Sequence, residues 1–169
     1  MAVPDGTSPY TATVGGSNGD DALVQGGADA ERLLGYNGAD TLEGAGGDDL
    51  LIGGRGDDTY VFRSGDGQDI IDNTGGGYDT LQFADAGFND VASGLMKSGD
   101  DLVLKVSGGP DQVTLRGFFR GGDEAIDRLV FSDGSLLDKA QIFGAFGLGD
   151  PDPDGSPDYS GLPDERAYG

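Results

Sequence analysis

A nine-residue repeat is the feature that most constrains how this chain can fold. Seven copies run from Gly16 to Gln82, each with small residues in its first positions, an acidic residue at the sixth and a large apolar residue at the eighth. A clear copy is Gly53-Gly54-Arg55-Gly56-Asp57-Asp58-Thr59-Tyr60-Val61. Short repeats of fixed period build solenoids, in which each unit packs only against its neighbours. The repeat therefore predicts a parallel β-solenoid.

Two positions of the repeat recur in every unit. The sixth position is always acidic: Asp21, Glu31, Asp40, Asp49, Asp58, Asp69 and Asp79. The eighth position is always large: Leu23, Leu33, Leu42, Leu51, Tyr60, Ile71 and Leu81. Extra residues are placed after units one (Gln25), five (Phe62 and Arg63) and six (Asn73). Unit two departs from the pattern, because Asp29 replaces the fourth-position glycine and Glu31 replaces the aspartate.

The spacing also predicts how the units stack. Six loop residues are followed by a three-residue strand whose eighth-position side chain points into the core. Two units complete one coil, so odd-numbered loops stack on one edge and even-numbered loops on the other. The acids then form two columns: Asp21, Asp40, Asp58 and Asp79 on the odd edge, and Glu31, Asp49 and Asp69 on the even edge.

Glycine-rich loops of this kind leave backbone carbonyls that need a partner. Glycine allows backbone conformations that a Cβ would forbid, and it lets neighbouring loops approach closely. Carbonyls in such a tight loop have no strand partner, and leaving them unpaired is costly. Calcium takes about six to eight oxygen ligands from carboxylates and carbonyls. The gaps between stacked loops, three on the odd edge and two on the even edge, therefore predict at most five interior Ca²⁺ ions.

The charge of the chain agrees with a cation-binding role and argues against several others. The 31 acidic residues outnumber the 10 Lys and Arg, which gives a net charge of −21, and there is no histidine or cysteine. Residues 1–82 carry 15 acids and 3 bases, a charge of −12. Such a negative surface repels nucleic acid and anionic lipid. Without histidine and cysteine, the chain lacks the ligands that zinc sites prefer. No apolar run approaches the roughly 20 residues of a membrane span.

Metal binding and folding are predicted to be coupled. Two carboxylates about 5 Å apart repel by roughly 3 kcal/mol at an effective dielectric constant of about 20. A thin core in a glycine-rich segment does not obviously offset several such terms together with the chain entropy. We therefore expect the repeats to be unfolded without calcium and to fold when they bind it.

Four segments are expected along the chain: an N-terminal arm (1–15), the roll (16–82), a β-rich cap containing one short helix (83–148) and a disordered, acidic, Pro-rich tail (149–169). In the cap, a hairpin is predicted from strands around 102–106 and 113–115, and a further strand at 129–131. Ser135 is expected to begin a helix over 139–146. Tyr60, Phe62, Phe83, Phe118 and Phe119 are expected in the core where roll and cap meet, with a stacking platform for sugars as the alternative.

The nonapeptide resembles the calcium-binding repeats of RTX (repeats-in-toxin) proteins. The segment from Asp101 to Phe143 is similar to the haemolysin-type calcium-binding related domain, notably in Gln112-Val113-Thr114-Leu115-Arg116-Gly117-Phe118-Phe119 and Ile126-Asp127-Arg128-Leu129-Val130-Phe131. The resemblance implies a calcium-binding parallel β-roll in a bacterial protein that a type I secretion system exports unfolded. It implies side-chain ligands at the seven sixth-position acids. It implies carbonyl ligands at the loop glycines Gly19, Gly38, Gly47, Gly54, Gly56, Gly65, Gly67, Gly75 and Gly77.

The leading hypothesis is a secreted, monomeric calcium-binding module that forms the C-terminal part of a larger toxin, adhesin or exoenzyme. The alternative is a calcium-stabilised module that binds polysaccharide or a cell surface through an exposed strand face. No enzyme activity is expected, because the sequence shows no nucleophile–base pair and no phosphate-binding loop.

Overall fold

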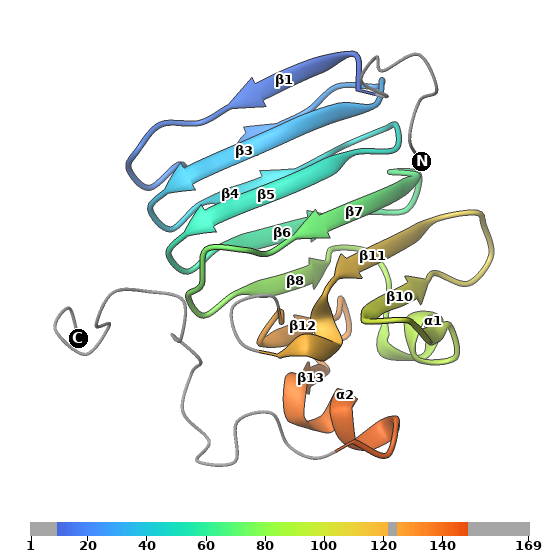
Figure 1. Cartoon of the computed structure of the whole chain (residues 1–169). Coiled ribbons are helices and arrows are strands. Elements are labelled where there is room, and N and C mark those ends of the chain that lie inside the picture. Colours follow the sequence, from blue (N-terminus) through green and yellow to red (C-terminus); the bar gives the residue numbers. More distant parts are fainter. Residues whose placement is uncertain (1–9, 122–124, 149–169) are drawn as a thin grey trace, which may run out of the picture.

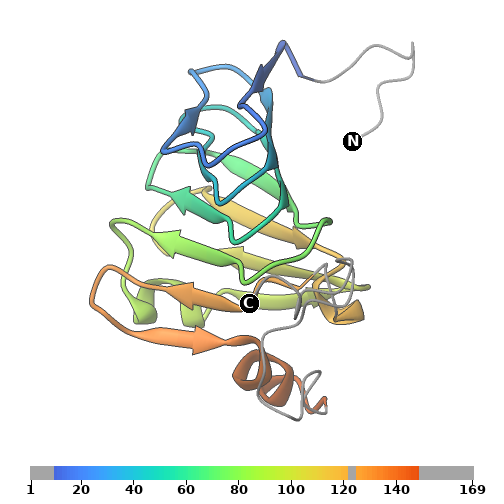
Figure 2. The same cartoon turned by 90° about the vertical axis from the view of Figure 1, so that its left-hand side faces the viewer.

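The computed structural model describes residues 10–121 and 125–148. The predicted tail (149–169) and most of the predicted N-terminal arm lie outside the described residues. Two sheets face each other across one apolar core, and the coils stack from β1 at one end to the cap at the other (Figure 1). A view turned by 90° shows the loops that link the strands of one sheet to those of the other (Figure 2).

The two sheets contain all thirteen strands of the described residues. The first sheet has seven strands in the order β1 (Ala12–Gly15), β3 (Glu31–Asn37), β5 (Leu50–Arg55), β7 (Gln68–Asp72), β11 (Gln112–Arg116), β10 (Asp101–Lys105) and β9 (Leu95–Ser98). The second has six, in the order β13 (Leu136–Asp138), β12 (Arg128–Val130), β8 (Thr80–Phe83), β6 (Thr59–Phe62), β4 (Thr41–Glu43) and β2 (Val24–Gln25).

The alternation of units between two edges is confirmed. Strands of units two, four and six are parallel neighbours in the seven-stranded sheet, and strands of the odd-numbered units are parallel neighbours in the six-stranded sheet. Eighth-position residues pair along each sheet, as Leu42 does with Tyr60 and Tyr60 with Leu81. From unit two onward these side chains are buried. The fold is thus the predicted β-roll.

Unit one corrects the predicted register. Val24, not Leu23, pairs with Leu42 and is buried, whereas Leu23 is 48 % exposed. The extra residue of unit one therefore lies before the strand and not after it at Gln25. A second difference is β1, which pairs in parallel with β3 and adds a strand before the first repeat. The roll begins inside the segment that was predicted to be an arm.

The cap continues both sheets of the roll. β11 pairs in parallel with β7, and β12 pairs in parallel with β8. The predicted hairpin is formed by β10 and β11, with Leu104 opposite Val113. Because Leu115 and Leu129 follow the register of Ile71 and Leu81, the apolar core runs without a break from roll to cap.

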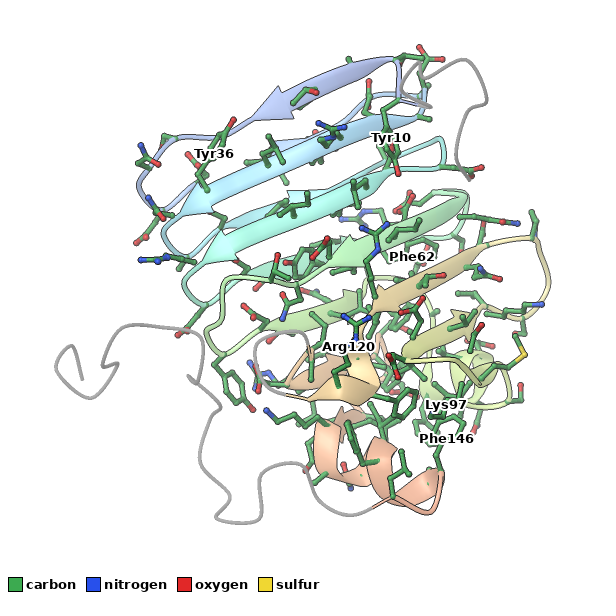
Figure 3. All side chains as sticks on the ribbon, in the orientation of Figure 1. Tyr10, Tyr36, Phe62, Lys97, Arg120 and Phe146 are labelled. Atoms are coloured by element: carbon green, nitrogen blue, oxygen red, sulfur yellow. The ribbon has the colours of Figure 1, made fainter. Side chains whose placement is uncertain are left out.

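Aromatic side chains fill this junction. Tyr60, Phe62, Phe83 and Phe118 are buried, as predicted, and Phe119 is partly buried. Phe83 stacks on Phe131 with ring centroids 5.5 Å apart and meets the edge of Phe62 at 5.9 Å. Figure 3 labels Phe62 at the level where β7 meets the cap.

Two short α-helices lie in the cap. The predicted helix is α2 (Lys139–Ala145), but Asp138 begins it and not Ser135: the Asp138 carboxylate accepts the N–H of Gln141, whose side chain accepts the N–H of Asp138. Residues 136–138 form β13 instead. A one-turn helix, α1 (Phe88–Ala92), and a 3₁₀ turn (Phe118–Arg120) complete the cap. Within the described ranges, no helix is long and apolar enough to cross a membrane.

Candidate metal sites in two carboxylate ladders

The sixth-position carboxylates form two hydrogen-bonded ladders along the edges of the roll. In each step, an aspartate Oδ1 accepts the backbone N–H of the sixth-position residue one coil earlier. The odd ladder links Asp21 to Asp40 (2.8 Å), Asp40 to Asp58 (2.9 Å) and Asp58 to Asp79 (2.8 Å). The even ladder links Glu31 to Asp49 (2.7 Å) and Asp49 to Asp69 (2.9 Å). The structure thus brings the predicted acids together in the two predicted columns.

The second oxygen of three of these carboxylates has no partner in the described part of the chain. The Oδ2 atoms of Asp40, Asp49 and Asp58 are buried and make no hydrogen bond to the described residues. Each of these three aspartates is only 1 % exposed. A buried oxygen without a partner is costly, and a carboxylate oxygen more so. The three atoms are therefore suited to a hard cation.

Burial also perturbs the protonation of these acids. It raises the pKa of Asp49 and Asp58 to about 7 and that of Asp69 and Asp79 to about 8, and it raises the pKa of Asp40. Backbone hydrogen bonds lower the pKa of each group in part, and neighbouring carboxylates raise it further. Negative charge in the ladders is thus disfavoured until a cation compensates it.

The loops place carbonyl oxygens next to these carboxylates. From unit three onward, the second and fourth positions of every loop have positive φ: Tyr36, Gly38, Ala45, Gly47, Gly54, Gly56, Gly65, Gly67, Gly75 and Gly77. Figure 3 labels Tyr36, which is 47 % exposed near the loop end of β3. At Gly35, an added Cβ would lie 2.5 Å from both Asp40 Oδ2 and the carbonyl oxygen of Gly53 in the next odd loop. Carboxylate and carbonyl oxygens therefore converge on the gap between coils.

The predicted loop glycines face the carbonyls of the coil before them. A Cβ on Gly56 would overlap the carbonyl oxygen of Gly38, and one on Gly77 would overlap that of Gly56. The same close approach occurs at Gly38, Gly47, Gly54, Gly67 and Gly75. Gly19, in the first coil, has only Ser17 Oγ within 4 Å of its added Cβ, at 3.9 Å, and Gly65 has nothing within 4 Å. The two residues inserted before unit six coincide with this break in the stacking.

The loops of the first two units differ from the later ones. The sequence predicted this for unit two but not for unit one. Neither Gly19 nor Asp29 has positive φ. The Glu31 carboxylate accepts the N–H of Gly27 within its own loop at 2.5 Å, and Asp21 accepts the N–H of Ser17 at 2.7 Å. The backbone nevertheless stays in place, because the carbonyl oxygen of Asp29 lies against Gly47 as a glycine carbonyl does in later coils.

No group of three or more acidic side chains converges on one point in residues 10–121 and 125–148. In the ladder geometry a gap instead brings a carboxylate together with a backbone carbonyl, as Asp40 Oδ2 with the carbonyl of Gly53. Calcium accepts backbone carbonyls readily, so such a donor set fits Ca²⁺.

Several residues of the ladders were missed by sequence reasoning. Asp20, Asp48 and Asp57, at the fifth position, accept the N–H of the fifth-position residue one coil later at 2.8–2.9 Å. In the cap, Asp127 accepts the N–H of Asp79 (2.7 Å), and Asp111 accepts those of Gly65 (2.8 Å) and Gly67 (3.3 Å). One signal was available: Asp127-Arg128-Leu129 repeats the acid-x-Leu spacing of the units.

Comparison with known families agrees with this geometry. Residues 25–60 match the RTX calcium-binding nonapeptide repeat (4 copies), and residues 101–141 match the haemolysin-type calcium binding protein related domain. No curated protein matched the chain in a sequence search. The matched repeats cover units two to five, where the stacking is least interrupted.

Proposed function

We propose that calcium binding makes this chain fold outside the cell, so that calcium acts as a folding switch. The chain carries RTX calcium-binding repeats followed by a haemolysin-type calcium-binding related domain, and it therefore contains a calcium-binding module. In this proposal the repeats remain unfolded at cytosolic calcium levels, pass through a type I secretion system, and fold in the extracellular medium. The chain then forms the C-terminal part of a larger exported protein.

The observation that carries the proposal is that the buried Oδ2 atoms of Asp40, Asp49 and Asp58 have no hydrogen-bond partner among the described residues. In the folded roll these oxygens have left water without gaining a hydrogen bond from residues 10–121 or 125–148. Their ionised forms are therefore more stable in the unfolded chain, unless a cation binds between the coils. Binding the cation and closing the roll become a single event.

The expected affinity matches an extracellular switch. Extracellular calcium modules typically have dissociation constants of about 10⁻⁴–10⁻³ M, far above the calcium concentration of a cytosol. A net charge of −21 further opposes compaction when no cation is bound. In calcium-rich surroundings the same charge attracts the ions that neutralise it.

We also propose that this segment has no catalytic role of its own. The buried acids are held in ladders by backbone N–H groups, and each is placed between stacked loops. That arrangement serves to hold ions between coils. The activity of the exported protein then belongs to a segment other than the roll.

The radius of gyration with and without calcium tests the proposed folding switch. A folded chain of 169 residues has a radius of gyration of about 15 Å, and the unfolded chain about 43 Å. Small-angle scattering should give a compact particle in millimolar Ca²⁺ and a markedly expanded one in chelator. Magnesium should not restore compaction, since it requires a smaller octahedral site and keeps its waters. An equally compact particle in chelator would exclude the switch.

Export is tested separately. A reporter fused before Met1 should leave cells that contain a type I secretion system, and the secreted fusion should resist protease only when calcium is present. Secretion of a fusion that is already protease-resistant inside the cell would contradict the proposed order of events.

A further inference from the structure

The odd ladder does not stop at the last repeat but ends inside the cap. β12 pairs with β8 in a register that puts Asp127 directly below Asp79. Asp127 Oδ2 accepts the N–H of Asp79 at 2.7 Å, which is the contact that links each sixth-position acid to the coil before it. Asp127 is thus a further rung of the ladder.

Protein groups, not a free gap, surround the carboxylates at this end. The Asp127 Oδ1 atom accepts a hydrogen bond from Lys139 Nζ at 3.0 Å, and these two side chains are only 3 % and 8 % exposed. Asp79 Oδ2 accepts from Asn73 Nδ2 at 2.8 Å. Asp58, one coil away from the cap, has no such partner for its Oδ2 among the described residues.

The even ladder ends in a different way. There β11 places Val113, an apolar residue, opposite Asp69. The cap acid at this end, Asp111, accepts the loop N–H groups of Gly65 and Gly67 and does not continue the sixth-position column. The lysine is found at the base of the ladder that continues with an acid.

We propose that the Lys139 ammonium is a built-in cation that replaces calcium in the terminal gap of the odd ladder. The proposal rests on the calcium switch described above. It adds that a side chain of the protein, and not a calcium ion, neutralises the last carboxylate of the odd ladder. The position of Lys139 is fixed twice, because its N–H donates to the carbonyl of Asp127 at 2.9 Å and its Nζ donates to the carboxylate. It is the first residue of α2, so formation of that helix delivers the charge.

Such a pair has a defined energetic signature. Removing one partner of a buried ion pair leaves an uncompensated charge and is strongly destabilising, whereas removing both charges is often tolerated. Calcium cannot simply replace a lost ammonium if the gap is shaped for the side chain. The consequences of changing Lys139 should therefore depend on the charge of Asp127 and should persist when calcium is saturating.

Three variants of the full chain test this. Lys139→Met removes the ammonium and keeps most of the apolar stem, and Lys139→Met combined with Asp127→Asn removes both charges. Lys105→Met is the matched control, because Lys105 is an exposed lysine of the cap. Amide hydrogen exchange is measured in saturating Ca²⁺, with the Asp79 amide as the probe since it donates to Asp127.

In Lys139→Met, exchange protection of the Asp79 amide should fall by roughly a hundredfold or more, as expected for a broken buried ion pair. In the double variant most of this protection should return, and Lys105→Met should match the wild type. Equal protection in Lys139→Met and Lys105→Met would overturn the inference, as would a double variant no better protected than Lys139→Met. Failure of the calcium switch would appear differently, as roll amides that stay protected in the wild type in chelator.

Discussion

Replacing Asp58 by asparagine is predicted to act in opposite directions with and without calcium. Asp58 is 1 % exposed; its Oδ1 accepts the N–H of Asp40, and its Oδ2 has no partner in the described structure. Burial raises its pKa from 3.8 to about 7. At about 1.4 kcal/mol per pH unit, ionising this carboxyl in the metal-free roll costs about 4 kcal/mol.

Asparagine keeps the acceptor for the Asp40 N–H and carries no charge. Without calcium, Asp58→Asn should therefore stabilise the folded roll by up to about 4 kcal/mol. With calcium, the same change removes an ionised oxygen from a gap between coils. The free energy of unfolding that saturating Ca²⁺ adds to the metal-free value should then be smaller than in the wild type, by about 1.4 kcal/mol for each tenfold loss of affinity at that gap.

The assay is far-UV circular dichroism in chelator across pH 4–9. A carboxyl whose pKa is raised by folding favours the folded state below its unfolded pKa of about 4, and this contribution is lost as pH rises through the folded pKa. Wild-type β-structure should therefore disappear as pH rises through the range of about 4 to 8, and Asp58→Asn should retain it to a higher pH.

Asp57→Asn is the matched control, because Asp57 is the exposed neighbour and loses the same charge. Loss of β-structure at the same pH in Asp58→Asn and Asp57→Asn, both in chelator, would contradict this role of the buried Asp58 carboxyl. So would an equal gain in the free energy of unfolding when saturating Ca²⁺ is added to each variant.

Three further predictions concern pH, the loops and the junction. In wild type, acidification from pH 8 to 5 should weaken calcium binding measured by calorimetry, since protons compete for the carboxyls whose pKa burial raises to about 7 and 8. Gly56→Ala should raise the calcium concentration at half-folding, because φ at Gly56 is +118° and the new Cβ would overlap the carbonyl oxygen of Gly38. Gly144→Ala, in open space on α2, should leave that concentration unchanged. Equal values for the two variants would show that the loops do not need the close approach at Gly56. Phe83→Ala should cost about 3–5 kcal/mol in denaturant unfolding with calcium, because Phe83 is 1 % exposed and stacks on Phe131; a cost below about 1 kcal/mol would show that the junction is not part of the core.

Much of the roll could be predicted from the sequence because its contacts are periodic. Each strand pairs with the strand two units later, so one spacing determines both the alternation of edges and the pairing of Leu42, Tyr60 and Leu81. The two carboxylate columns follow from the same spacing. A local pattern was sufficient here because the long-range contacts repeat it.

Where the period is interrupted, sequence alone could not give the register. In unit one an extra residue separates Asp21 from the strand, and Leu23 and Val24 are both apolar candidates for the core. In the structure, Val24 takes the core position, and it is the residue that pairs with Leu42. The spacing offered no means to see this, since either register buries one large side chain.

The residues that close the ladders were the hardest to predict. Asp127 meets Asp79 at a separation of 48 residues along the chain, Lys139 meets Asp127 at 12, and Asp111 meets Gly65 at 46. These contacts occur once and depend on how the cap folds back beneath the roll. The acid-x-Leu spacing at Asp127 hinted at a further rung, but no local pattern indicated the lysine.

The coupling of calcium to folding can be measured with a single titration. Far-UV circular dichroism of the full chain at neutral pH is followed while Ca²⁺ is added and then removed with chelator. Cooperative gain of β-structure, with a midpoint in the range of about 10⁻⁴–10⁻³ M and full reversal by chelator, is the expected result. A β-structure spectrum in chelator equal to that in calcium would show that the buried carboxylates do not need the metal to fold.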